Sequence, residues 1–65
     1  MPKTGVLVRR LKRAGFELVR HGKSHDIWEN PQTRRRVVVP RHARDIPTGT
    51  YFSILRDAGL GPEEE

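Results

Sequence analysis

The sequence predicts a small α+β domain with the element order α-β-β-β-α. Apolar residues recur at helical spacing near both ends of the chain, and three short segments rich in β-branched and aromatic residues lie between them. Because these segments are adjacent and joined by short turns, they are expected to form a three-stranded antiparallel sheet. Both helices are expected to lie on one face of the sheet, so that their apolar stripes share one core.

The first helix is predicted from Thr4 to Ala14. Leu7, Leu11 and Ala14 recur at helical spacing, while basic residues occupy the remaining face. Gly15 follows directly and suits a left-handed C-terminal cap. The segment is therefore an amphipathic helix with one strongly basic side.

The second helix is predicted near the C-terminus. Thr48 or Thr50 can cap its first turn, and Gly59 can cap its end. Its apolar stripe consists of Tyr51, Ile54, Leu55 and Ala58. This stripe predicts that the helix packs against the sheet beside the first one.

Strands are predicted over residues 16–20, 26–29 and 35–40. Gly22 marks the turn between the first two strands, and the Asn-Pro sequence at residues 30–31 begins the second turn. Short turns of this kind favour hairpins.

Trp28 tests the proposed layers. Ile27 and Trp28 are neighbours in a strand and point to opposite faces. Either the open face of the sheet is unusually apolar, or Trp28 lies at a sheet end that a helix covers. We favour a core position for Trp28, because single aromatic side chains are usually buried.

The length of 65 residues allows one small domain. Residues 1–60 are expected to form it, and residues 61–65 to be a frayed acidic tail. The chain has no cysteine and no His cluster at zinc-ligand spacing, so neither a disulfide nor a bound metal is predicted. No apolar run resembles a membrane span or the core of a signal peptide, so a cytoplasmic protein without membrane contact is expected.

The charge of the chain is unevenly distributed. Three of its eight acidic residues are the last three residues, so residues 1–60 carry thirteen basic and five acidic groups, a net charge of +8. A small body with this charge attracts polyanions, of which nucleic acid is the commonest in a cytosol. The alternative is that the charge serves only solubility.

A series of short motifs is similar in order and spacing to those of the HicA family of toxins, the ribonuclease half of HicA–HicB toxin–antitoxin pairs. The resemblance covers about residues 5–60. It is carried by Ala14-Gly15-Phe16, Val19-Arg20 before the turn, Ser24-His25 with Trp28 three residues on, Asn30-Pro31, Val39-Pro40, Ile46-Pro47-Thr48-Gly49-Thr50 and Ser53-Ile54-Leu55-Arg56-Asp57-Ala58-Gly59.

This resemblance implies a fold like that of double-stranded-RNA-binding domains, cleavage of mRNA without a metal or other cofactor, and silencing by a HicB antitoxin that masks the active site. It also implies that His25 is the catalytic histidine. The family usually has Lys-Gly-Ser-His, whereas this chain has Gly22-Lys23-Ser24-His25. Lys23 adopts a positive φ less easily than glycine, so the changed order of glycine and lysine can affect the geometry of the turn and the rate of cleavage.

Metal-independent RNA cleavage needs one group that takes a proton from the ribose 2′-hydroxyl and one that gives a proton to the leaving 5′-oxygen. Histidine suits either task, because its ordinary pKa of about 6.5 makes both protonation states available near neutral pH. His21 or His42 can approach His25, and the second proton can also move through water, Lys23 or the substrate.

Several polar and basic residues are candidates for RNA binding. Lys23 and Ser24 can contact the scissile phosphate, although both also suit an ordinary turn. Basic residues at the two ends of the third strand can follow an RNA backbone or protect a sheet edge from aggregation. The candidate RNA-binding residues are Arg20, Lys23, Ser24, Arg34, Arg36 and Arg41.

Two other functions stay open on the sequence alone. The same charge and fold also fit a basic RNA-binding module that does not cleave its ligand. A DNA-binding regulator is the weaker alternative, because no helix-turn-helix spacing is visible.

Overall fold

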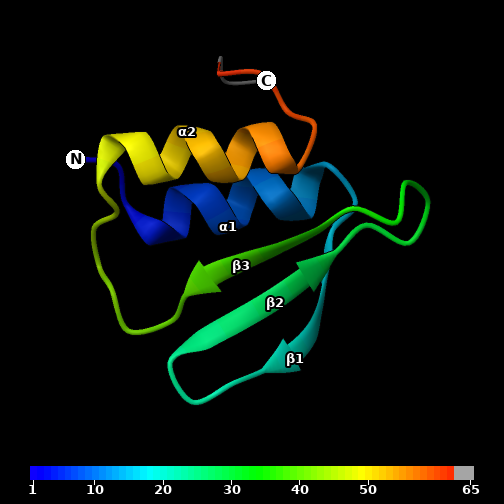
Figure 1. The fold of residues 1–65 in the computed structure, drawn as a ribbon, viewed down its shortest axis with the longest axis horizontal. Coiled ribbons are helices and arrows are strands. Elements are labelled where there is room, and N and C mark those ends of the chain that lie inside the picture. The colour runs from blue at the N-terminus through cyan, green and yellow to red at the C-terminus, as the bar shows by residue number, and fades with distance from the viewer. Residues whose placement is uncertain (63–65) are drawn as a thin grey trace.

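The computed structural model of the protein describes residues 1–62 and has the predicted order α-β-β-β-α (Figure 1). Its elements are α1 (Thr4–Arg13), β1 (Glu17–His21), β2 (His25–Glu29), β3 (Arg36–Pro40) and α2 (Thr48–Asp57). Each element agrees with its predicted range to within a few residues. The last three residues of the predicted acidic tail lie outside the described residues.

The three strands form one antiparallel sheet in the order β1-β2-β3. Pairing between β2 and β3 is regular, from His25 opposite Pro40 to Glu29 opposite Arg36. Pairing between β1 and β2 shifts register at Val19, where β1 contains a bulge. The predicted antiparallel meander is confirmed.

Both helices lie side by side on one side of the sheet, and β1 is the strand farthest from them (Figure 1). All five residues of β1 are exposed, whereas Val37 and Val39 of β3 are buried. The helices therefore cover β3 and β2, and the β1–β2 hairpin extends beyond the core. This leaves the opposite sheet face open to solvent.

The core is built from the apolar stripes of both helices and one face of the sheet. Trp28 is 7% exposed, and the ammonium of Lys12 lies 6.0 Å from the centre of its ring. The core position expected for Trp28 is therefore confirmed. The buried apolar residues are Leu7, Leu11, Phe16, Trp28, Val37, Val39, Ile46, Tyr51, Ile54, Leu55 and Ala58.

The ends of the helices agree with the sequence in part. Gly15 and Gly59 follow the two helices with positive φ values of 96° and 77°, as predicted for left-handed caps. The prediction that Thr48 or Thr50 caps α2 is wrong. Pro47 occupies the N-cap position with an extended backbone, so both threonines lie inside the helix and no side chain caps it.

The N-terminal residues pair with the loop that follows β3. Lys3 forms an isolated bridge with Asp45, and the Thr4 amide donates to the carbonyl of Arg44 at 2.9 Å. These contacts hold the 41–47 loop against the start of α1 and seat Ile46 in the core. No helix within residues 1–62 is long and apolar enough to cross a membrane.

Candidate functional site

His25 is the first residue of β2 and lies on the open face of the sheet. It pairs with Pro40 and alternates with Asp26 and Trp28, which belong to the opposite, helix-covered face. Its side chain is exposed and makes no hydrogen bond or ion pair with any other residue in the range 1–62. Both ring nitrogens are therefore available to an external molecule.

The turn before His25 explains the position of its glycine. The Gly22 amide donates to the carbonyl of His25 at 2.9 Å, and a Cβ at position 22 would lie 2.4 Å from that oxygen. Lys23 has no positive φ, since Arg34 is the one non-glycine residue with positive φ in the described part of the chain. The turn thus needs glycine at position 22 and accepts lysine at position 23.

Four of the candidate RNA-binding residues lie at the same end of the sheet as His25: Arg41, which follows β3, and three residues of β1 and the next turn. Lys23 and Ser24 form the exposed turn directly before it. Arg20 pairs with Ile27, two residues along β2 from His25, so it shares the open face as a diagonal neighbour of His25. The hydroxyl of Ser24 and the cationic groups of Arg20 and Lys23 thus belong to the same sheet end as an exposed imidazole, and such groups suit a phosphate.

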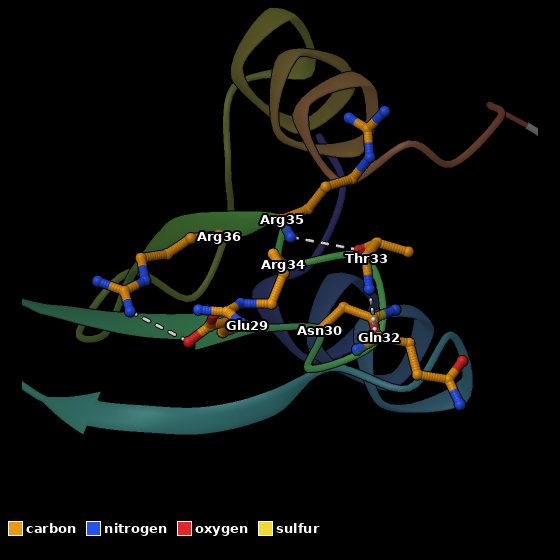
Figure 2. A network of polar contacts seen from close by, with 7 residues as sticks. All are labelled: Glu29, Asn30, Gln32, Thr33, Arg34, Arg35 and Arg36. Carbon is orange, nitrogen blue, oxygen red and sulfur yellow. Dashed lines mark hydrogen bonds and ion pairs between the residues drawn. The ribbon is translucent and has the colours of Figure 1, made fainter.

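Arg34 and Arg36 lie at the other end of the sheet. Both contact the carboxylate of Glu29, Arg36 at 3.1 Å and Arg34 at 3.6 Å (Figure 2). Glu29 is four residues from His25, which corresponds to about 13 Å along β2. The structure therefore does not bring these two arginines to His25, and it pairs both with an acidic residue that the sequence did not single out.

Arg35, between these two arginines, points toward α2 (Figure 2). Its Nη1 donates to the carbonyl of Asp57 at 3.2 Å, at the C-terminal end of the helix. A cation at this end of a helix interacts favourably with the unpaired carbonyls and the helix dipole. The middle one of the three consecutive arginines thus links the turn after β2 to the end of α2, whereas the other two contact Glu29.

Asn30 organises the turn that carries these arginines. It is buried, and its Nδ2 donates to the carbonyl of Ala14 at 3.0 Å. Its Oδ1 accepts the Gln32 amide at 2.9 Å, and its backbone pairs with Arg35 (Figure 2). The turn was predicted from its Asn-Pro sequence, but the link from Asn30 to the end of α1 required the tertiary structure.

The other two histidines lie on the helix side of the same sheet end. His21 Nδ1 is 2.9 Å from Asp26 Oδ1, and its Nε2 contacts Arg41 Nη1. Arg41 Nη2 lies 3.3 Å from His42 Nε2, which is 3.2 Å from the carbonyl oxygen of Lys23. The structure therefore brings His21 and His42 to Arg41, with His25 on the opposite face.

A hollow lies on the open face at the end away from His25. It is lined by Glu17, Val19, Glu29, Pro31 and Arg34. Glu17 pairs directly with Glu29 across the two strands, so two carboxylates lie together at this end of the open face, beside Arg34 and Arg36. Sequence reasoning missed the pair, because its alignment depends on the β1–β2 register and on the bulge within β1.

The described residues offer no metal site. Within residues 1–62, no three His, Asp or Glu side chains converge in a way that could hold a metal ion.

Comparison with known proteins identifies a family for this chain. Residues 6–60 match the family described as the HicA toxin of bacterial toxin-antitoxin systems. A comparison with curated proteins found no match. The family match covers the whole sheet, α2 and all of α1 except its first two residues. A toxin of this family acts together with an antitoxin partner. The chain therefore belongs to the HicA toxin family of bacterial toxin–antitoxin systems.

Proposed function

We propose that this toxin is a metal-independent endoribonuclease that cleaves mRNA in the cytoplasm, with His25 as its catalytic residue. One observation carries the proposal. Among the three histidines, His25 is the one whose imidazole has no protein partner within residues 1–62, and it lies exposed beside the polar turn Lys23-Ser24. A general acid or base must reach the proton it transfers, and such an imidazole can do so.

The chemistry begins with the ribose 2′-hydroxyl. His25 takes its proton, the 2′-oxygen attacks the adjacent phosphorus, and the bond from phosphorus to the 5′-oxygen breaks. The products are a 2′,3′-cyclic phosphate and a 5′-hydroxyl, whose proton comes from water, Lys23 or the substrate. The ammonium of Lys23 and the hydroxyl of Ser24 can stabilise the charge on the phosphorane oxygens.

The proposed RNA surface is the open face of the sheet. Arg20, Lys23 and Ser24 surround the reacting phosphate, and Arg41 adds charge at the same sheet end. Arg34 and Arg36 can contact a more distant phosphate, which competes with Glu29 for them. Phosphate contacts of this kind make binding steeply dependent on salt.

The antitoxin partner is proposed to be a HicB-type protein that covers this same open face. Residues 1–60 carry a net charge of +8, so an acidic partner competes with RNA for the surface by charge complementarity. A purified acidic protein encoded beside the toxin gene should form a complex with it and suppress cleavage. A complex that leaves cleavage unchanged would contradict this part of the proposal.

The central experiment compares the wild type with His25→Ala. Each is incubated with a single-stranded mRNA in excess EDTA, and the fragments and their 3′ ends are analysed. Wild type is expected to release fragments with cyclic phosphate ends, and His25→Ala is expected to release none. Because the His25 side chain is exposed and makes no side-chain hydrogen bond within residues 1–62, the variant should keep its fold and its RNA affinity.

The matched control is Arg56→Gln, which changes an exposed residue of α2 and should cleave as wild type does. Equal cleavage by His25→Ala and wild type would overturn the role of His25. Salt-sensitive RNA binding without cleavage by any variant, including in the presence of ribosomes, would instead identify a non-catalytic RNA-binding module.

A further inference from the structure

A chain of polar contacts encloses the His25 turn from the face opposite to His25. It begins at the Asp26 carboxylate, continues through the His21 ring to the Arg41 guanidinium, and reaches the His42 ring. It ends at the carbonyl of Lys23. These residues come from β1, from β2 and from the loop after β3, so the contacts join all three parts of the sheet end.

Two consecutive carbonyls of the turn are held by two consecutive residues of the loop after β3. The Arg41 amide donates to the carbonyl of Ser24 at 2.9 Å, and His42 Nε2 lies 3.2 Å from the carbonyl of Lys23. A carbonyl oxygen only accepts hydrogen bonds, so His42 Nε2 carries the proton in this contact and does not accept from Arg41 Nη2, which lies 3.3 Å from it. Arg41 and His42 thus hold the backbone of the Lys23-Ser24 turn in place.

The protonation of His21 follows from its partners in the same way. The Arg41 guanidinium has no acceptor, so His21 Nε2 accepts from it. His21 Nδ1 then carries the proton and lies 2.9 Å from Asp26 Oδ1, a close polar contact without the geometry of a hydrogen bond. Asp26 lies next to His25 in β2 and is 16% exposed in its side chain, so the chain of contacts begins at a mostly buried group.

We propose that His21, Arg41 and His42 are positioning residues, which hold the Lys23-Ser24 turn in the geometry that cleavage requires. This inference rests on the proposed ribonuclease activity and adds residues that do not touch the reacting atoms. It also gives Arg41 a second role beside phosphate binding. Small displacements of a catalytic group lower the rate by as much as about 100-fold. A turn held in place by these three residues should therefore give a higher kcat than a turn that can shift.

The first test separates the hydrogen bond of His42 from its bulk. His42→Leu removes the donor to the Lys23 carbonyl, whereas His42→Gln can supply an amide donor in its place. We expect His42→Leu to lower kcat by about tenfold or more while KM stays within about twofold. His42→Gln should recover most of this loss. If His42 served only stability, two variants with equal unfolding midpoints would have equal kcat. A higher kcat for His42→Gln than for His42→Leu at equal midpoints therefore supports the positioning role.

The second test addresses the other end of the chain of contacts. His21→Phe removes both ring nitrogens at an exposed position and should lower kcat in the same direction. Arg41→Gln is compared with Arg56→Gln, which removes the same charge from the far helix. We expect Arg41→Gln to lower kcat more than it raises KM, and Arg56→Gln to leave both unchanged.

The outcomes distinguish this inference from the proposed function. If His25→Ala is inactive while His42→Leu and His21→Phe retain the wild-type kcat, the positioning role is overturned and the ribonuclease stands. If Arg41→Gln changes only KM, Arg41 binds RNA and does not position the turn. If His25→Ala cleaves as wild type does, the role of His25 is overturned and the ribonuclease activity stands. If wild type itself binds RNA without cleaving it, the proposed function fails.

Discussion

Gly22 and His25 are in closer contact than any side chain at position 22 would allow. The Gly22 amide donates to the His25 carbonyl at 2.9 Å, and a Cβ at Gly22 would stand 2.4 Å from the same oxygen. The proposed catalytic residue therefore takes its place in the sheet through a contact with the glycine three residues before it.

Gly22→Ala should disrupt this contact. The new methyl group forces the turn and the start of β2 apart, and we expect a loss of about 1–3 kcal/mol in the free energy of unfolding. Urea unfolding measures it. The control is Gly5→Ala in α1, where a Cβ meets no atom within 4 Å. That change should raise stability by about 0.5–1 kcal/mol, because alanine favours the helix. Equal effects of the two changes would contradict the close contact.

Asn30→Ala should be among the most destabilising changes of a polar residue. It removes the donor to the Ala14 carbonyl and the acceptor for the Gln32 amide at a buried position, and we expect a loss of about 2–3 kcal/mol. Thermal or urea unfolding checks it. Gln32→Ala, at an exposed position of the same turn, should change stability by less than about 0.5 kcal/mol. If Asn30→Ala lost no more stability than Gln32→Ala, the hydrogen bonds of the Asn30 side chain would not be needed to stabilise the turn.

Glu17→Gln should stabilise the protein and strengthen RNA binding together. Glu17 lies directly opposite Glu29, and like charges at paired positions cost about 0.2–1 kcal/mol. Removing one of them also makes the proposed RNA surface less acidic, so the dissociation constant at low salt should fall. Asp57→Asn removes the same charge from the end of α2 and should leave RNA affinity nearly unchanged. If Glu17→Gln and Asp57→Asn raised RNA affinity equally, RNA would not bind specifically at the open face of the sheet.

Trp28 permits a test of the core that separates volume from polarity. Its Nε1 is buried and has no hydrogen-bond partner within residues 1–62. Trp28→Phe removes this unpaired N–H and keeps an aromatic ring, so it should cost less than about 2 kcal/mol. Trp28→Ala should cost about 3–5 kcal/mol. Unfolding by urea measures both, and equal losses would mean that the indole makes a specific contact.

Local pattern was sufficient for much of this fold. The spacing of Leu7 and Leu11 predicted the buried side of α1, and Gly15 and Gly59 predicted the helix ends. These features depend on residues close in sequence, where backbone geometry alone sets which side chains share a face. The threonine caps predicted for α2 failed because Pro47 took the N-cap position. A capping residue can be recognised from sequence only when the helix start is known to within one residue.

The sequence by itself determined the element order, the antiparallel sheet, the charge of the body and the exposed turn at His25. Only the tertiary structure decided which charged groups meet. The carboxylate of Glu29 holds Arg34 and Arg36 because β3 returns beside β2, and Arg41 reaches His21 because the sheet brings residues twenty positions apart together. Such contacts follow from strand register and from a bulge at Val19, and the register depends on packing against both helices.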